Sequence, residues 1–135
     1  MSGMTETESR KFQDGSDAII AAMIEVHRVL GPGLVESSYE TALEHELRLR
    51  GHHVERQRPI DFDYKGLIVR NAHRLDLIVD HRIVIEIKAV DLLAPIHNAQ
   101  LLTYLKLTGL EIGLLVNFNV STLRRGLRRV WRDGR

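Results

Sequence analysis

Hydrophobic residues recur at helical spacing in the first part of the chain. Residues 1–15 are polar and aperiodic, and we expect them to form a disordered tail. A helix is predicted from Ser16 to Leu30, with one buried face. The side chains expected on that face are Ile20, Met23, Ile24, His27 and Leu30.

A second amphipathic helix is predicted after the break Gly31-Pro32-Gly33. It runs through Arg50 and is closed by Gly51, because glycine readily adopts the left-handed conformation that follows many helices. Its inner stripe consists of Tyr39, Leu43 and Leu47.

From His53 onward the hydrophobic period becomes that of β-strands. The expected strands cover residues 54–63, 67–69, 75–79, 83–90, 112–118 and 127–131. A further helix fits residues 95–108, where Pro95 takes the first position and Gly109 follows the end. Helices and strands together indicate one α/β domain over residues 16–135, which the length of 135 residues and the 44% hydrophobic content suit.

Cysteine is absent from the sequence. Its absence excludes disulfide bonds, thiolate zinc sites and a cysteine nucleophile, so any metal must be held by oxygen or imidazole ligands. The N-terminus lacks the basic and apolar regions of a signal peptide, and no apolar run approaches membrane-spanning length. We therefore expect a soluble, cytoplasmic protein without membrane association.

Positive charge is concentrated near the C-terminus, although the net charge of the chain is only +1. Residues 123–135 contain six arginines against one acid, Asp133. These arginines either cover a solvated strand edge or contact phosphate or another acidic surface. In the second interpretation, Arg128 and Arg129 are candidates for substrate binding.

The segment 74–90 carries the most informative polar residues. Strand alternation puts Glu86 and Lys88 on the same face. A three-residue loop over 80–82 would pair Val79 with Ile83, Leu77 with Ile85 and Leu75 with Ile87. The same register sets Asp76 opposite Glu86, close enough for the two carboxylates to share one cation.

Two carboxylates on hydrophobic strands need a neutralising partner, because an unpaired buried charge is costly. Hard oxygen ligands with open positions suit Mg²⁺ or Mn²⁺ rather than zinc. With such a metal, Lys88 could orient the attacking water or stabilise developing charge. The alternative is a buried ion-pair network of Asp76, Glu86 and Lys88 without a metal.

Four other residues are weaker candidates for the same site. Glu36 lies in the first turn of the second helix, where the helix dipole also favours an acid. His97, Gln100 and Tyr104 share one stripe of the helix over 95–108, where they either contact a substrate phosphate or the site lysine, or form a half-exposed rim. The histidines without ligand spacing, which we interpret as surface residues, include His45, His52 and His53.

Taken together, the motifs of the chain resemble those of the GxxExxY proteins, small prokaryotic members of the PD-(D/E)xK nuclease superfamily. Gly33-Leu-Val-Glu36-Ser-Ser-Tyr39 matches the naming motif. Further matches, in order, are Tyr64-Lys65-Gly66, Leu75-Asp76-Leu77, Glu86-Ile-Lys88-Ala89, Gln100…Tyr104-Leu105-Lys106 and Asn117-Phe118-Asn119. The resemblance covers nearly everything from Ala18 to Val130.

This resemblance implies a mixed central β-sheet flanked by helices, with Asp76 and Glu86 as metal ligands and Lys88 as the catalytic lysine. It also implies that Glu36 is the helix carboxylate that completes the metal site. Gln100 matches the glutamine that many superfamily members carry on the following helix. The resemblance does not specify what is cut.

Three functions fit these residues. The first is a Mg²⁺-dependent nuclease that acts on DNA rather than RNA, with duplex or structured DNA favoured because the 5% of aromatic residues are scattered and offer no stacking platform. The second is a catalytically silent module that keeps the nuclease fold and binds nucleic acid or a partner protein. The third is a protein-interaction subunit whose acids serve only stability. A homodimer, which a small nuclease domain commonly needs to reach both strands, is compatible with the sequence.

Overall fold

The computed structural model describes residues 14–135, so the tail expected over 1–15 falls almost entirely outside the described range. Two helices come first, α2 (Ser16–Leu30) and α3 (Glu36–Leu49). They are followed by β1 (Val54–Tyr64), β2 (Leu67–Val79), β3 (Ile83–Lys88), α4 (Pro95–Thr108), β4 (Ile112–Asn117), a short 3₁₀ helix η2 (Leu123–Gly126) and β5 (Leu127–Trp131). No helix within this range has the length and hydrophobicity needed to cross a membrane.

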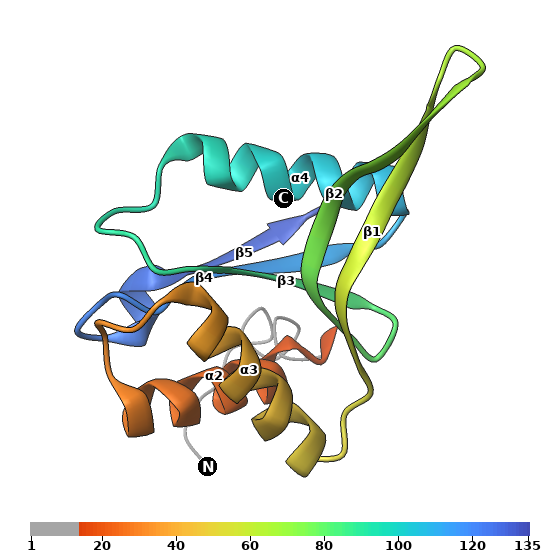
Figure 1. Ribbon diagram of the computed structural model, residues 1–135. Coiled ribbons are helices and arrows are strands. Elements are labelled where there is room, and N and C mark those ends of the chain that lie inside the picture. Colours follow the sequence, from red (N-terminus) through yellow and green to blue (C-terminus); the bar gives the residue numbers. More distant parts are fainter. Residues whose placement is uncertain (1–13) are drawn as a thin grey trace.

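The five strands form one sheet in the order β1-β2-β3-β4-β5. Neighbouring strands are antiparallel except β3 and β4, which are parallel and are joined through α4. Helices α2 and α3 lie on one face of the sheet and α4 lies on the other (Figure 1). The chain therefore has the mixed α/β sheet, flanked by helices, that its sequence predicts.

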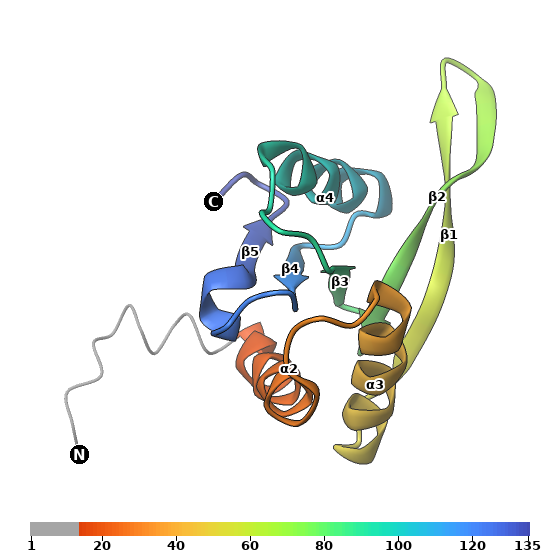
Figure 2. The same cartoon turned by 60° about the vertical axis from the view of Figure 1, so that its left-hand side comes forward.

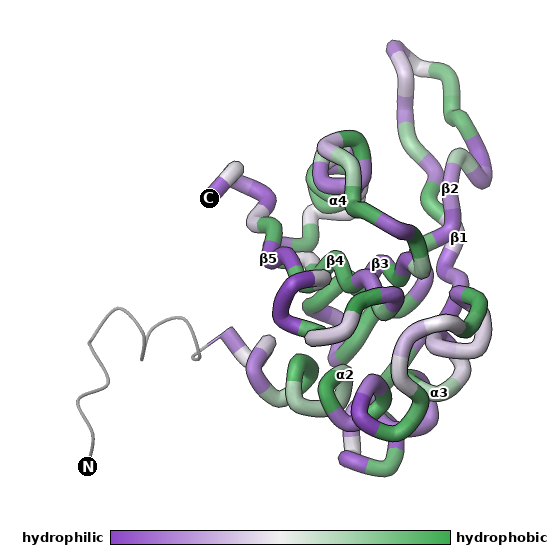
Figure 3. Tube along the Cα trace, turned by 90° about the vertical axis from the view of Figure 1, so that its left-hand side faces the viewer, coloured by the Kyte–Doolittle hydropathy of each residue, from purple (hydrophilic) through white to green (hydrophobic). Residues whose placement is uncertain are grey.

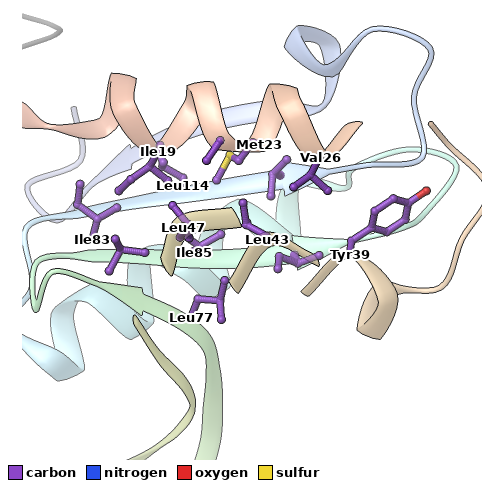
Figure 4. Close-up of a cluster of buried hydrophobic side chains, with 14 of the residues drawn as sticks. Ile19, Met23, Val26, Tyr39, Leu43, Leu47, Leu77, Ile83, Ile85 and Leu114 are labelled. Atoms are coloured by element: carbon purple, nitrogen blue, oxygen red, sulfur yellow. The ribbon is translucent and has the colours of Figure 1, made fainter. Parts of the chain in front are cut away.

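Two hydrophobic layers hold the helices on the sheet. The layer between the sheet and helices α2 and α3 includes Ile19, Met23, Leu43, Leu47, Leu77, Ile85 and Leu114 (Figure 4). On the opposite face, Leu101 and Leu105 of α4 pack against Ile78, Val84 and Leu115. Figure 3 shows the hydrophobic strands β3 and β4 between these two helix layers. Because both of their faces are covered, these strands have nearly continuous apolar sequences.

The buried face of α2 is rotated from the predicted one. The side chains that reach the core are Ile19, Ala22, Met23 and Val26. Ile24 and Leu30, which were expected on this face, are 53% and 39% exposed. The helix carries apolar residues around most of its circumference, so its hydrophobic pattern alone did not fix which stripe would meet the sheet.

Strand β2 is longer than predicted. Residues 67–69 and 75–79 were expected as separate strands, but they belong to one strand that pairs with β1 along a two-stranded arm. The arm extends beyond the rest of the molecule (Figure 2). Residues 70–74 are mostly exposed on both sides, so they lack the apolar alternation by which a half-buried strand is recognised.

Candidate metal and catalytic site

The hairpin of β2 and β3 has the expected register at its closed end. Val79 pairs with Ile83 and Leu77 pairs with Ile85. The paired ladder ends there, and the predicted pairing of Leu75 with Ile87 is wrong. Leu75 packs on the α4 side of the sheet, whereas Ile87 packs on the side of α2 and α3.

This divergence arises from a reversal of β2 at Asp76. Leu77 faces α2 and α3 while Leu75 faces α4, although residues two apart in a regular strand share a face. On β1, the register places Gln57 beside Asp76, and Gln57 has a left-handed backbone with φ of 55°. Asp76 therefore lies at the point where the side chains of β2 exchange faces of the sheet and where β2 separates from β3.

At this point the side chains of Asp76 and Glu86 connect the two strands. Asp76 Oδ2 accepts a hydrogen bond from the backbone N–H of Ile87 at 2.7 Å. Glu86 Oε1 accepts one from the backbone N–H of Asp76 at 3.3 Å. Glu86 is only 5% exposed, so the structure brings the two acids together in a largely buried position.

Burial makes both carboxyl groups hard to ionise. Loss of hydration raises the pKa of Asp76 to about 6. Loss of hydration, together with the charge of Asp76, raises the pKa of Glu86 to about 8. The charge of Lys88 opposes both shifts, but no lysine or arginine of residues 14–135 forms an ion pair with either acid. When both are ionised, the pair therefore carries negative charge that Lys88 offsets only in part, and its oxygen donors suit a hard divalent cation such as Mg²⁺ or Mn²⁺.

A further buried acid, Glu40 of α3, reaches this region from the helix side. Its carboxylate accepts hydrogen bonds from Arg56 Nε at 2.6 Å and Gln57 Nε2 at 2.9 Å. Gln57 Nε2 also lies 3.4 Å from Asp76 Oδ1, so it connects the two acids. Sequence reasoning missed Glu40, although it follows Glu36 by one helical turn and therefore lies near the same helix face.

Glu36 lies at the rim of the site. Its side chain is exposed, and Oε1 accepts a hydrogen bond from the backbone N–H of Ala89 at 3.3 Å, directly after Lys88. The first turn of α3 thus contacts the end of β3. Glu40, one turn later, lies deeper.

Tyr39 anchors the start of α3 from within the core. The ring is fully buried and stacks on Phe118 with a centroid distance of 4.6 Å. Its hydroxyl donates to the carbonyl of Gly31 at 2.6 Å and accepts from the N–H of Leu34 at 3.1 Å. The tyrosine of the GxxExxY motif therefore fixes the loop that leads into α3.

His73 and Tyr104 border the acids on the α4 side. Their rings stack at 4.1 Å with an interplanar angle of 12°, and His73 Nε2 lies 3.9 Å from Glu86 Oε2. This nitrogen is buried and has no hydrogen-bond partner among the described residues. Burial and the positive charge of Lys88 lower the pKa of His73, which disfavours protonation of its ring. Buried polar atoms without partners are uncommon, and this one makes His73 a candidate site residue that no sequence motif indicated.

The three residues of the predicted α4 stripe have different surroundings. Gln100 is exposed. His97 Nδ1 accepts a hydrogen bond from the backbone N–H of Ala94 at 3.0 Å, and so it caps the start of α4. Tyr104 is half-buried, and its pKa is raised by burial and by the charges of Glu86 and Asp76.

The two arginines predicted to bind substrate lie on opposite faces of β5. Arg128 pairs with Leu115, whose side chain packs under α4, so Arg128 lies on the same face as Glu86 but two strands away. Arg129 lies on the other face, where it is half-buried and its Nε is 4.0 Å from Asp14 Oδ2. The structure therefore does not bring the two arginines together.

The sheet, its flanking helices and the acids at the junction of β2 and β3 define a nuclease-type α/β fold. The sequence profile of the PD-(D/E)XK nuclease superfamily matches residues 13–130. The chain belongs to this superfamily.

A solved structure described as SSO0001 has a similar fold, with a TM-score of 0.52 and 21% sequence identity. The match covers 90% of this chain and 60% of that chain, so this protein spans 60% of the length of SSO0001. At this level of identity, the similarity concerns the fold alone. No curated protein matches the sequence significantly.

Proposed function

We propose that this protein is a Mg²⁺- or Mn²⁺-dependent nuclease of the GxxExxY type that hydrolyses phosphodiester bonds in DNA. The observation that carries the proposal is the largely buried pair of Asp76 and Glu86 beside Lys88. Both acids have raised pKa values, and neither has an ion-pair partner among the described lysines and arginines. A divalent cation bound by their oxygen atoms would relieve the repulsion between the two ionised carboxylates.

In this proposal Asp76 and Glu86 hold the metal, with Glu36 at the rim and Glu40 anchoring Gln57 beside Asp76. A divalent cation supplies polarisation of a phosphoryl oxygen and a nucleophile derived from water at neutral pH. Lys88 contributes a fixed positive charge where negative charge develops on the phosphate.

Substrate contacts are proposed on the α4 face, which Glu86 shares. Tyr104, Gln100 and His97 of α4, and Arg128 of β5, would contact the phosphate backbone, whereas Arg129 lies on the opposite face. Duplex DNA is preferred over single strands because aromatic residues make up only 5% of the chain and are scattered. A homodimer would provide one site for each strand.

The proposal is tested by metal titration and cleavage assays on the same samples. Wild-type protein is incubated with linear, branched and single-stranded DNA and with RNA, with and without Mg²⁺ or Mn²⁺. Asp76→Asn should lose both metal binding and cleavage, whereas Lys88→Met should lose cleavage and retain metal binding. Lys106→Met, an exposed lysine on α4, is the matched control and should retain both.

A different result would favour the binding module. That function requires salt-sensitive DNA binding without cleavage at any metal concentration, and an affinity that Lys88→Met leaves unchanged. Light scattering during gel filtration would show whether the active species is a dimer.

A further inference from the structure

A second group of metal-binding side chains lies where the hairpin of β2 and β3 closes. Within residues 14–135, His53, Glu55 and His81 are the one set of three histidine or acidic residues whose donor atoms all lie within 4.8 Å of one another. His81 Nδ1 is 3.3 Å from Glu55 Oε1, and His53 Nε2 is 3.9 Å from the same oxygen. The three residues come from the loop after α3, from β1 and from the turn between β2 and β3.

This group is separate from the acid pair described above. The turn residue Asp80 follows Asp76 by four positions, which corresponds to roughly 13 Å of extended strand. The donor chemistry also differs, because two imidazoles and one carboxylate replace a set of oxygen ligands.

The spacing of the donor atoms fits a tetrahedral metal. Two ligand atoms bound to Zn²⁺ at about 2.0–2.1 Å lie roughly 3.3–3.4 Å from each other. The observed separations from Glu55 Oε1 are 3.3 Å to His81 and 3.9 Å to His53. The rings of His53 and His81 stack at a centroid distance of 4.2 Å, with a nitrogen of each beside Glu55. Small side-chain movements would therefore complete the site.

Asp80 holds the two histidine-bearing segments together. Its Oδ1 accepts a hydrogen bond from the backbone N–H of His53 at 2.9 Å, and its own N–H donates to the carbonyl of His53 at 2.8 Å. Its Oδ2 lies 2.7 Å from His52 Nδ1. Asp80 and His81 both have left-handed backbones, with φ of 54° and 57°, a conformation that aspartate tolerates better than histidine does. The turn thus holds His81 beside Glu55 at a conformational cost.

We propose that His53, Glu55 and His81 form a binding site for a transition-metal ion of the Zn²⁺ type. Two imidazoles and a carboxylate suit zinc, nickel or cobalt better than magnesium. The side chains are exposed or half-buried, so a coordination position remains open to solvent. A bound ion fastens the loop after α3, strand β1 and the β2–β3 turn to one another, at the base of the strands that carry Asp76 and Glu86.

Zinc calorimetry on full-length protein without a polyhistidine tag tests this site. One Zn²⁺ should bind per chain, and Glu55→Gln and His81→Asn should each weaken binding by roughly tenfold or more. Asparagine is chosen at position 81 because it tolerates a left-handed backbone. His45→Asn, which changes an exposed histidine on α3, is the matched control and should bind Zn²⁺ like the wild type.

Thermal unfolding provides the second readout. Zn²⁺ should raise the midpoint of the wild type and of His45→Asn, and it should not raise that of Glu55→Gln. Asp76→Asn should keep zinc binding, so this site can succeed or fail independently of the proposed nuclease. The proposal is overturned if the wild type shows no saturable zinc binding. It is equally overturned if binding survives both cluster variants or is lost in Asp76→Asn instead.

Discussion

The carboxylates of Asp76 and Glu86 connect β2 and β3 where the backbone ladder ends. Each accepts a hydrogen bond from a backbone N–H, Asp76 from Ile87 across the gap and Glu86 from Asp76 itself. The two acids therefore continue the connection between β2 and β3 with side-chain hydrogen bonds after the backbone register has ended. For this reason, isosteric amide variants separate charge from structure better than alanine variants do.

The metal-free protein should lose stability as the pH rises from 4.5 towards about 8. Burial raises the pKa of Glu86 from 4.5 to about 8, so in this range the folded chain holds a proton that the unfolded chain releases. Because the folded state binds more protons, the free energy of unfolding falls as the pH increases. Asp76 acts in the same direction up to about 6. Urea unfolding in the presence of a chelator measures this slope.

Two variants identify the group responsible. Glu86→Gln should flatten the pH dependence, whereas Glu111→Gln, at an exposed acid before β4, should leave it unchanged. Adding Mg²⁺ should restore stability to the wild type at the upper end of the range. A free energy of unfolding that increases with pH over this range would show that Glu86 is ionised in the folded state.

The hydrophobic pattern correctly predicted those elements that have clear end signals and are buried on one face or on both. The helix over 95–108 and the strand over 127–131 have the predicted bounds, because proline and glycine mark the helix ends and the strand is short. The three-residue hairpin loop likewise gave the pairing of Val79 with Ile83. These features depend on local sequence and on one-sided or complete burial.

Other features depend on contacts that a pattern does not encode. The reversal at Asp76 accompanies a left-handed backbone at Gln57, a residue without the sequence signal of a glycine. His53 and His81 come together only because the hairpin folds back on the loop after α3. His73 of β2 meets Glu86 of the neighbouring strand β3. Long-range packing therefore assembled these clusters, whereas the sequence had indicated Asp76, Glu86, Lys88 and Tyr104 but neither His73 nor Glu40.

Removing the Arg56 side chain should lower the stability of the fold, because the buried Glu40 carboxylate loses its charged hydrogen-bond donor. Glu40 is 7% exposed and accepts a 2.6 Å hydrogen bond from Arg56 Nε. Arg56→Ala should lower the free energy of unfolding by about 1–3 kcal/mol, because a buried carboxylate loses its charged donor. Adding Glu40→Gln to this variant should recover part of the loss, as urea unfolding of both would show. Arg58→Ala, at an exposed arginine on the same strand, is the control and should change little.

Tyr39→Phe should loosen the loop that leads into α3. The variant keeps the stack on Phe118 but loses the hydrogen bonds to Gly31 and Leu34. We expect a loss of about 1 kcal/mol of stability and faster hydrogen exchange at the amide of Leu34. Tyr64→Phe, at a tyrosine that is 57% exposed, should have neither effect. Unchanged exchange at Leu34 would mean that the hydroxyl does not hold this loop.

His73→Phe should stabilise the metal-free protein while impairing its activity. The phenyl ring can keep the stack on Tyr104, and the substitution removes a buried nitrogen that lacks a partner among the described residues. A gain of about 1 kcal/mol is expected in urea unfolding, since the desolvation penalty of that nitrogen disappears. Cleavage, or Mn²⁺ affinity by calorimetry, should fall because Nε2 lies 3.9 Å from Glu86 Oε2 and faces the proposed metal site. His45→Asn serves as the control with both properties unchanged. If His73→Phe were less stable than the wild type, the nitrogen would contribute a structural hydrogen bond. If metal binding and cleavage were unchanged, His73 would line the site without taking part in metal binding or catalysis.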